Sequence, residues 1–291
     1  MRSENRAILD AAIVAARGAD AHAVLLTSSE EAEAGYLRRR LGRGTRVISP
    51  LTGPGALTGS DEDEVITLPR IRLRRRGRAK VALLEALASG VILPGERVVV
   101  VSGDGSGDDA RLDTVALIEL TGEDELIARA SGETLSSLAH VADPAVFDTV
   151  LALCIELSRH GREGRPVGFL AVLGDHEAVM ERSHPLVLNP FEGHDSDVRC
   201  VLYPAARRAI REFSGMDGAF VISGDGIVMA AGRYLQELAD HSVPVGLGAR
   251  HRAAAGITET TRSIAFVVSE SSGEVRIFSG GRVLTTLSPE D

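Results

Sequence analysis

Short apolar runs alternate with segments of helical spacing at the start of the chain, and this alternation constrains the fold more than any other feature. The runs at residues 23–27 and 98–102 are rich in Val and Leu, as buried strands are. Residues 5–17 and 79–88 instead carry apolar side chains at helical spacing. Because strands that alternate with helices form βαβ units, we expect residues 1–125 to form an N-terminal α/β sandwich with a mainly parallel sheet.

The pattern of the second half predicts a different arrangement. Pro144 suits the first turn of a long helix over residues 145–160. Further on, residues 219–222 and 227–230 flank Ser223-Gly224-Asp225-Gly226, and Asp-Gly favours the tight turns of β-hairpins. We therefore expect a C-terminal α/β domain whose mixed central sheet is flanked by helices.

The remaining elements of this half follow from the same kinds of signal. In order we expect a strand at 169–173, a helix at 177–183, an irregular loop at 184–197, a helix at 203–213 and strands at 264–269, 275–279 and 283–287. The chain is then expected to consist of domains at residues 1–125 and 144–291, joined by a linker at residues 126–143.

Charge and lysine content restrict the kind of phosphate site that this chain can build. With 41 acidic and 32 basic residues the formal net charge is −9, which disfavours generic capture of nucleic acid. Lys80 is the only lysine, and the sequence contains no Gly-Lys-Ser or Gly-Lys-Thr, so a P-loop is excluded. A phosphate site must therefore use arginines and backbone amides. The arginine-rich residues 70–78 are more typical of a solvated strand-to-helix connection than of a nucleic-acid arm.

Cysteine usage and hydropathy bear on the compartment. Cys154 and Cys200 have no metal-ligand spacing and suggest no disulfide scaffold, which fits a reducing cytoplasm. Residues 1–10 are polar and lack the apolar core of a signal peptide, and no apolar run approaches the length that crosses a bilayer. We therefore expect a soluble, cytoplasmic protein without a membrane partner.

Two short segments of the second half carry the candidate chemistry. Asp217 lies between glycine-containing turns just before an apolar strand, and its carboxylate is a candidate metal ligand. In Gly248-Ala249-Arg250-His251-Arg252, a glycine leads through basic residues into small helix formers. Exposed N–H groups at a helix start attract anions, and arginine adds bidentate phosphate recognition. Together the segments fit phosphoryl or nucleotidyl transfer, in which positioning and charge neutralisation dominate.

Each segment alone has a simpler interpretation. Asp217-Gly218 is most often only a turn, and Arg250-His251-Arg252 is more often a solvated basic cluster. Their occurrence in one expected domain favours the functional interpretation. A metallohydrolase is a weaker hypothesis, because His176, His184 and His194 are spaced too irregularly for a zinc pattern.

Four segments between residues 217 and 273 match the motifs of a known enzyme family in order and spacing. They are Asp217-Gly218-Ala219, Ala230-Ala231-Gly232-Arg233-Tyr234-Leu235, Arg250-His251-Arg252-Ala253-Ala254 and Val267-Val268-Ser269-Glu270-Ser271-Ser272-Gly273. In these segments the chain resembles the diadenylate cyclases, a family known for an Asp-Gly-Ala motif followed by an Arg-His-Arg motif. The resemblance extends weakly back to the helix at Pro144.

The resemblance implies a reaction and its participants. Two ATP molecules are joined into cyclic di-AMP, two pyrophosphates are released, and Mg²⁺ or Mn²⁺ is the divalent metal. Asp217 is implied to help activate the ribose 3′-hydroxyl and to bind the metal. The implied catalytic set is Asp217, Gly218, Ala219, Arg250, His251 and Arg252.

The resemblance also assigns residues to the nucleotide. Arg250 and Arg252 are implied to hold the triphosphate, and Ser269 adds a phosphate contact. Tyr234 and Leu235 are implied to border the adenine. The full ATP-binding set is Gly232, Tyr234, Leu235, Arg250, Arg252, Thr258, Ser269 and Glu270.

Two further roles and two departures come with the matched positions. Gly218 is implied to let the backbone lie close to the nucleotide, and His251 to stabilise the motif and not to act as a base. Ala249 stands where many members have threonine, so one hydroxyl contact is missing. Thr258 and Glu259 stand where many members have Ser-Glu. These departures resemble the soluble, archaeal-type branch of the family.

The N-terminal half resembles, in pattern and without a sharp motif, the C-terminal α/β domain of pyruvate kinase, which accompanies that branch. This implies effector sensing or oligomer assembly, and a purely structural partner domain stays open beside them. For the C-terminal half, the alternative is a non-catalytic adenine-nucleotide sensor that uses the same pocket. Asp217 argues against that alternative, because a binding module needs no acid at the 3′-hydroxyl.

The product implies how many subunits take part. Cyclic di-AMP has two equivalent phosphodiester links, whereas the chain carries one Asp-Gly-Ala and one Arg-His-Arg segment. We therefore expect a homo-oligomer in which two catalytic domains face each other and symmetry makes both links by one mechanism.

Overall fold

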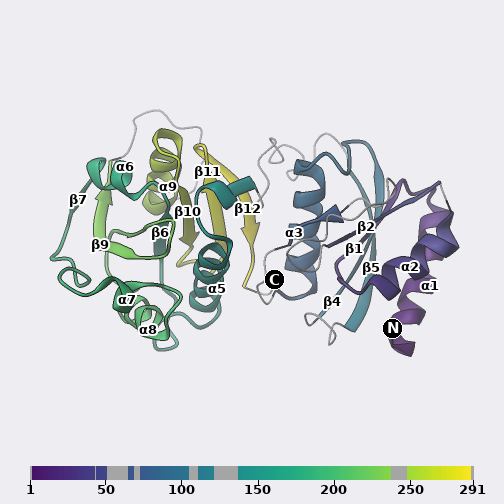
Figure 1. Ribbon diagram of the computed structural model, residues 1–291, viewed down its shortest axis with the longest axis horizontal. Coiled ribbons are helices and arrows are strands. Elements are labelled where there is room, and N and C mark those ends of the chain that lie inside the picture. The colour runs from purple at the N-terminus through teal and green to yellow at the C-terminus, as the bar shows by residue number, and fades with distance from the viewer. Residues whose placement is uncertain are drawn as a thin grey trace. The chain divides into compact units, whose positions relative to one another are not determined.

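The computed structural model describes residues 2–42, 44–50, 65–68, 73–104, 111–120, 137–236 and 248–289. The chain divides into two compact units, one formed by Met1–Ser136 with Glu290–Asp291 and the other by Ser137–Pro289. Figure 1 labels most of their helices and strands, and each unit has its own sheet. None of the helices in the described ranges is both long and apolar enough to cross a membrane.

The N-terminal unit is a five-stranded sheet with helices on both faces. Its helices are α1 (Ser3–Gly18), α2 (Glu31–Leu41) and α3 (Arg75–Ala88), and its strands are β1 (Ala23–Leu26), β2 (Arg46–Pro50), β3 (Val65–Ile66), β4 (Arg97–Asp104) and β5 (Arg111–Glu119). The strand order is β3-β2-β1-β4-β5, with β4 and β5 antiparallel and the other pairs parallel. The predicted α/β sandwich with a mainly parallel sheet is confirmed.

Strand β1 lies at the centre of this sheet and is buried on both faces. Val24 and Leu26 pack into the cluster that contains the apolar side chains of α1 and α2. Ala23 and Leu25 point the other way, into the cluster that contains the side chains of α3. Burial on both faces explains why the strand reads as an unbroken apolar run without alternation.

The arginine-rich segment is only partly a connection. Arg75, Arg76 and Arg78 belong to the first turn of α3, so their predicted place in a strand-to-helix connection is wrong. Arginine is a good helix former, and an exposed first turn accepts it. Arg75 also makes an ion pair with Asp113 of β5 at 3.2 Å. Arg70 and Arg72 lie outside the described residues.

The C-terminal unit is a seven-stranded mixed sheet flanked by helices. Its helices are α5 (Pro144–His160), α6 (His176–Glu181), α7 (Ser196–Arg199), α8 (Pro204–Phe213) and α9 (Ala249–Thr260), and a 3₁₀ turn covers Ser137–His140. Its strands are β6 (Phe169–Leu173), β7 (Ser183–Pro185), β8 (Ala219–Ile222), β9 (Val228–Leu235), β10 (Ile264–Val268), β11 (Val275–Ser279) and β12 (Arg282–Leu287). The order is β12-β11-β10-β6-β8-β9-β7, with β6 and β8 parallel and the other pairs antiparallel. The predicted mixed central sheet is confirmed.

Strand β10 shows how this sheet is covered on both faces. Ala265 and Val267 pack into one cluster with the apolar side chains of α9. Phe266, which points to the opposite face, lies with its ring centroid 5.4 Å from that of Phe147 in α5. Helix α5 begins at Pro144 as predicted, and the carboxylate of Asp143 accepts a hydrogen bond from the backbone of the first turn.

Residues 184–197, predicted as an irregular loop, are partly regular. β7 pairs antiparallel with the end of β9, with Ser183 opposite Leu235 and His184 opposite Tyr234. Because a three-residue edge strand that ends in Pro185 has no visible periodicity, it was not expected from the sequence. The predicted helix at 177–183 ends at Glu181, and α7 begins at Ser196, near the end of the expected loop.

Candidate active site

A pocket of about 890 Å³ lies at the first turn of α9, where the loop before β8 and the ends of β9 and β10 also meet. Nine residues predicted as site residues line it: Asp217, Gly218, Ala219, Tyr234, Leu235, Arg250, His251, Ser269 and Glu270. The Asp-Gly-Ala and Arg-His-Arg segments therefore share one cavity.

The sheet topology explains why segments distant in sequence meet here. β6 lies between β8 and β10, running parallel to β8 and antiparallel to β10. The start of β8 and the end of β10 therefore lie at the same edge of the sheet, beside the start of β6. Asp217 precedes β8 and Ser269 follows β10, so both project at this edge.

Arg250 is the charged centre of the pocket. It is the second residue of α9, after the N-cap Gly248, so its guanidinium adds to the positive end of the helix dipole. Its Nη2 lies 3.6 Å from a carboxylate oxygen of Asp217, and its Nη1 lies 3.9 Å from Glu270 Oε2. The side chain of Asp217 is 92% exposed, whereas that of Arg250 is 33% exposed. The arginine is held by the wall of the pocket, and the acid extends into solvent.

His251 points away from this charged centre and into the core. It is 6% exposed, and its Nε2 lies 2.9 Å from Nη1 of Arg276, which in turn makes an ion pair with Glu274. Burial, reinforced by the charge of Arg276, lowers the pKa of His251 to about 4. The imidazole is therefore neutral near pH 7, and its Nε2 accepts a hydrogen bond from the Arg276 guanidinium. This geometry supports the expected stabilising role.

Two glycines bring the loop before β8 against strand β9. Gly218 has a φ of +95°, and a Cβ placed on it would lie 2.7 Å from the backbone nitrogen of Arg233. A Cβ on Gly232 would lie 2.5 Å from a methyl of Val187 and 2.9 Å from the sulfur of Met216. Gly218 was expected to allow close approach to a nucleotide, and the close approach seen in the structure is to β9.

The remaining lining combines an aromatic ring with aliphatic side chains. Tyr234 is 43% exposed, and its ring centroid lies 5.0 Å from that of His184 on the neighbouring strand. Leu235 is buried, and Leu186 is partly exposed. A pocket with an apolar lining and a guanidinium is suited to a ligand that has both a flat apolar part and an anionic part.

Comparison with known proteins connects this geometry to a family. The model of the family described as DisA bacterial checkpoint controller nucleotide-binding matches residues 156–283, a range that contains the whole pocket lining. A diadenylate cyclase of Methanocaldococcus jannaschii is 34% identical over 236 residues, which cover 79% of this chain and 73% of that relative. The chain belongs to the diadenylate cyclase family.

A second relative agrees with this assignment. A diadenylate cyclase of Haloferax volcanii is 45% identical over 150 residues, 51% of this chain and 55% of that relative. Among solved structures, a double mutant of DacA from Staphylococcus aureus is 24% identical, with a TM-score of 0.34, over 50% of this chain and 88% of that one. The family model described as probable sensor domain DacZ_P matches residues 3–127. As a diadenylate cyclase family member the chain is an enzyme, while the pyruvate kinase resemblance of its N-terminal half stays a prediction.

Three residues that the family resemblance assigned to the site do not line the pocket. Thr258 is buried, and its hydroxyl donates to the carbonyl of Ala254 at 2.8 Å and accepts from the backbone of Gly281. It therefore connects α9 to the turn between β11 and β12. Arg252 is exposed outside the lining, and Gly232 has the packing role described above.

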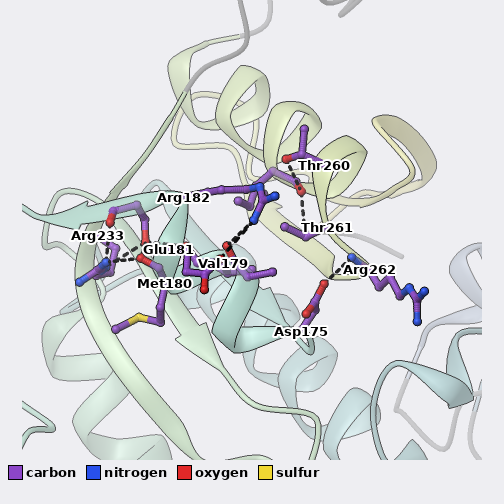
Figure 2. A network of polar contacts seen from close by, with 12 residues as sticks. Asp175, Val179, Met180, Glu181, Arg182, Arg233, Thr260, Thr261 and Arg262 are labelled. Carbon is purple, nitrogen blue, oxygen red and sulfur yellow. Dashed lines mark hydrogen bonds and ion pairs between the residues drawn. The ribbon is translucent and has the colours of Figure 1, made fainter.

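Arg233 lines the pocket although it was not singled out from the sequence. Its Nη2 donates to the carbonyls of Met180 and Ser183 at 2.8 and 2.6 Å, and its Nε donates to the Ser183 hydroxyl at 3.0 Å. Figure 2 shows the guanidinium turned toward Met180, at the end of helix α6. Burial lowers the pKa of Arg233. The residue stands inside a quoted family segment, but its role depends on carbonyls about fifty residues away, which no local signal reveals.

Asp217 is the one residue predicted from the sequence to bind a metal ion. In the part of the chain that the structure describes, no group of three or more His, Cys, Asp or Glu side chains is arranged to hold a metal ion. Asp217 supplies one exposed carboxylate at the pocket. Magnesium is commonly bound by one or two carboxylates together with substrate phosphates and water. The residues present thus fit a metal that a bound nucleotide helps to hold.

Proposed function

We propose that the C-terminal unit condenses two ATP molecules into cyclic di-AMP and two pyrophosphates. The observation that carries the proposal is the shared pocket, in which the carboxylate of Asp217 and the guanidinium of Arg250 lie 3.6 Å apart. Nucleotidyl transfer needs a carboxylate that accepts the proton of the attacking hydroxyl and, beside it, a cation that stabilises the charge on the phosphates.

In each half-reaction the 3′-hydroxyl oxygen of one ATP attacks the α-phosphorus of the other. A phosphorus–oxygen bond forms, the bond to the pyrophosphate oxygen breaks, and the hydroxyl proton is lost. Asp217 accepts the hydrogen bond of this hydroxyl and draws its proton away. Its exposure allows the carboxylate to reach a second nucleotide that lies beyond its own pocket.

Arg250 holds the triphosphate at the first turn of α9. Its guanidinium lies within 4 Å of two carboxylates, at distances of 3.6 and 3.9 Å. These contacts are long for charge-assisted hydrogen bonds, so the guanidinium retains capacity for phosphate oxygens. The Ser269 hydroxyl, across the pocket at the end of β10, adds a phosphate contact. Tyr234 and Leu235 border the adenine, which packs against the apolar lining.

Asp217, together with the phosphates of ATP, would hold a divalent cation, either Mg²⁺ or Mn²⁺. When bound, such an ion neutralises negative charge that develops on the phosphate oxygens. The exposed carboxylate of Asp217 supports this arrangement, because the nucleotide then supplies the remaining oxygen ligands.

Both links of the product are made when two subunits face each other. Each subunit presents one ATP with its triphosphate at Arg250, and the 3′-hydroxyl comes from the nucleotide of the other subunit. A two-fold arrangement then makes the two links equivalent. We assign catalysis to residues 144–291 and connection to residues 126–143, and we propose that residues 1–125 sense an effector or assemble the oligomer.

The test is incubation of the purified protein with ATP and either Mg²⁺ or Mn²⁺, followed by chromatographic separation of the nucleotides. Formation of cyclic di-AMP and pyrophosphate in a 1:2 ratio is the expected result. Binding of ATP without cyclic di-AMP would overturn the proposal and leave the non-catalytic sensor.

A further inference from the structure

Gly168 lies directly under the guanidinium of Arg250. It is buried and immediately precedes β6, whose first residue Phe169 pairs with Val268 at the end of β10. This register places Gly168 beside the segment that continues into Glu270. A Cβ built on Gly168 would lie 2.5 Å from Nη1 and 2.9 Å from Cζ of Arg250, and 3.3 Å from Glu270 Oε2.

The backbone of Gly168 does not itself require glycine. Its φ lies outside the positive range that side chains avoid, unlike that of Gly218, at +95°. The constraint at this position is therefore space. Real Cβ atoms essentially never approach another heavy atom as closely as 2.5 Å, so any side chain here would displace the guanidinium.

We propose that Gly168 is a positioning residue for triphosphate binding, because its missing side chain leaves the space in which the Arg250 guanidinium lies between Asp217 and Glu270. The inference rests on the proposed function, in which Arg250 holds the triphosphate. Gly168 itself touches no substrate and acts only through the arginine.

Replacement of Gly168 by alanine should change the position of the Arg250 guanidinium without changing the stability of the fold. The atoms that it would meet are the far ends of two long side chains, which are able to rotate away without disturbing the sheet. The fold should therefore tolerate the change, whereas the guanidinium must leave the position in which it lies 3.6 Å from Asp217 and 3.9 Å from Glu270. Loss of one charge-assisted phosphate contact corresponds to about a tenfold weaker affinity.

The experiment compares Gly168→Ala, Arg250→Ala and the double variant in the full-length protein. The matched control is Gly215→Ala, because a Cβ there meets its nearest atom at 3.7 Å and the backbone is not in the positive-φ range. The readouts are the Kd of the Mg²⁺ complex of α,β-methylene-ATP, which cannot lose pyrophosphate, and the melting temperature. Cyclic di-AMP formation by the wild type is measured in parallel.

We expect Gly168→Ala to weaken analogue binding about tenfold with an unchanged melting temperature, and Gly215→Ala to bind like the wild type. In the Arg250→Ala background, Gly168→Ala should cause no further loss, because the group it displaces is gone. Wild-type affinity in Gly168→Ala, or additive losses in the double variant, would overturn the inference. If Gly168→Ala does not fold, the double variant decides the question, because it lacks the guanidinium that the new Cβ would meet. A double variant that folds supports the inference, and a double variant that also does not fold refutes it. A wild type that binds the analogue but forms no cyclic di-AMP refutes the proposed function alone.

Discussion

The Nε2 atom of His251 lies 2.9 Å from the Nη1 atom of Arg276, and this contact joins the first turn of α9 to strand β11. His251 follows Arg250 directly in sequence, so its contact with Arg276 fixes the helical turn that carries Arg250. Glu274 balances the charge of Arg276 through an ion pair. The motif is therefore supported by Arg276 and Glu274, which do not line the pocket.

Replacement of Arg276 by methionine should loosen this support. The buried Nε2 of His251 loses its donor, and an unsatisfied buried acceptor costs about 1–3 kcal/mol. We expect a lower melting temperature and a KM for ATP that rises more than kcat falls. The control is Arg282→Met on the same hairpin, whose side chain is exposed. Equal effects of the two variants would contradict the role of Arg276.

Stability should fall with acid because of His251. Its pKa is about 4 in the folded protein, lowered by burial and by the charges of Arg276 and Arg250 and partly raised by Glu274, against an ordinary value of 6.5. As the pH falls from 6.5 to 4, the unfolded chain binds a proton that the folded chain refuses, so the free energy of unfolding decreases. The contribution is at most about 1.4 kcal/mol per pH unit. Urea denaturation should show a shallower pH dependence for His251→Gln than for the wild type, and parallel curves would contradict the assignment.

Asp217→Asn should abolish most of the turnover and leave the fold intact. The change removes one negative charge, and the side chain is 92% exposed, so unfolding should be unaffected. Loss of a proton acceptor lowers turnover by about a hundredfold or more. The Kd for α,β-methylene-ATP should change much less, because Arg250 and the apolar lining remain. Asp197→Asn, an exposed acid of α7, is the control, and turnover of Asp217→Asn within about threefold of the wild type would remove Asp217 from the mechanism.

The two arginines of the Arg-His-Arg segment should differ in effect. Arg250 lines the pocket and Arg252 does not, although the family resemblance assigned both to the triphosphate. Arg250→Ala is expected to cost about 2–4 kcal/mol of ATP binding, and Arg252→Ala clearly less. Isothermal titration with α,β-methylene-ATP measures both. Equal losses would mean that the triphosphate extends beyond the pocket to Arg252.

Cyclic di-AMP formation should depend on subunit pairing. If two facing subunits form one working unit, specific activity rises steeply with protein concentration wherever pairing is incomplete. Rates measured across a dilution series, beside sedimentation of the same samples, test this. A rate per subunit that stays flat down to monomeric samples would rule out the facing pair.

Local signals predicted most of the elements. The β8–β9 hairpin follows from Asp225-Gly226, and the start of α5 follows from Pro144, because turn and first-turn preferences involve near neighbours in sequence. Strand β7 was missed because it pairs with the end of β9, which lies about fifty residues away in sequence.

The motifs of the site could be predicted from the sequence, but which of their side chains face the pocket could be predicted less well. Motif spacing predicted one site for Asp217 and Arg250, and both residues line one pocket. Which side chains of α9 face that pocket depends on helix rotation, and Arg252 lies roughly 200° around the axis from Arg250. Thr258 faces the neighbouring hairpin, and Gly168 has significance only through a side chain more than eighty positions later. These assignments require the assembled sheet.

The place of β6 between β8 and β10 also sets the width of the pocket. Asp217 precedes β8 and Ser269 follows β10, two strands separated by two strand spacings, roughly 10 Å, and this width is fixed by backbone hydrogen bonds. Side-chain substitutions change the charge and the lining of the pocket but not this width. A relative that accepts a longer or shorter polyphosphate in the same orientation would therefore need a rearranged sheet.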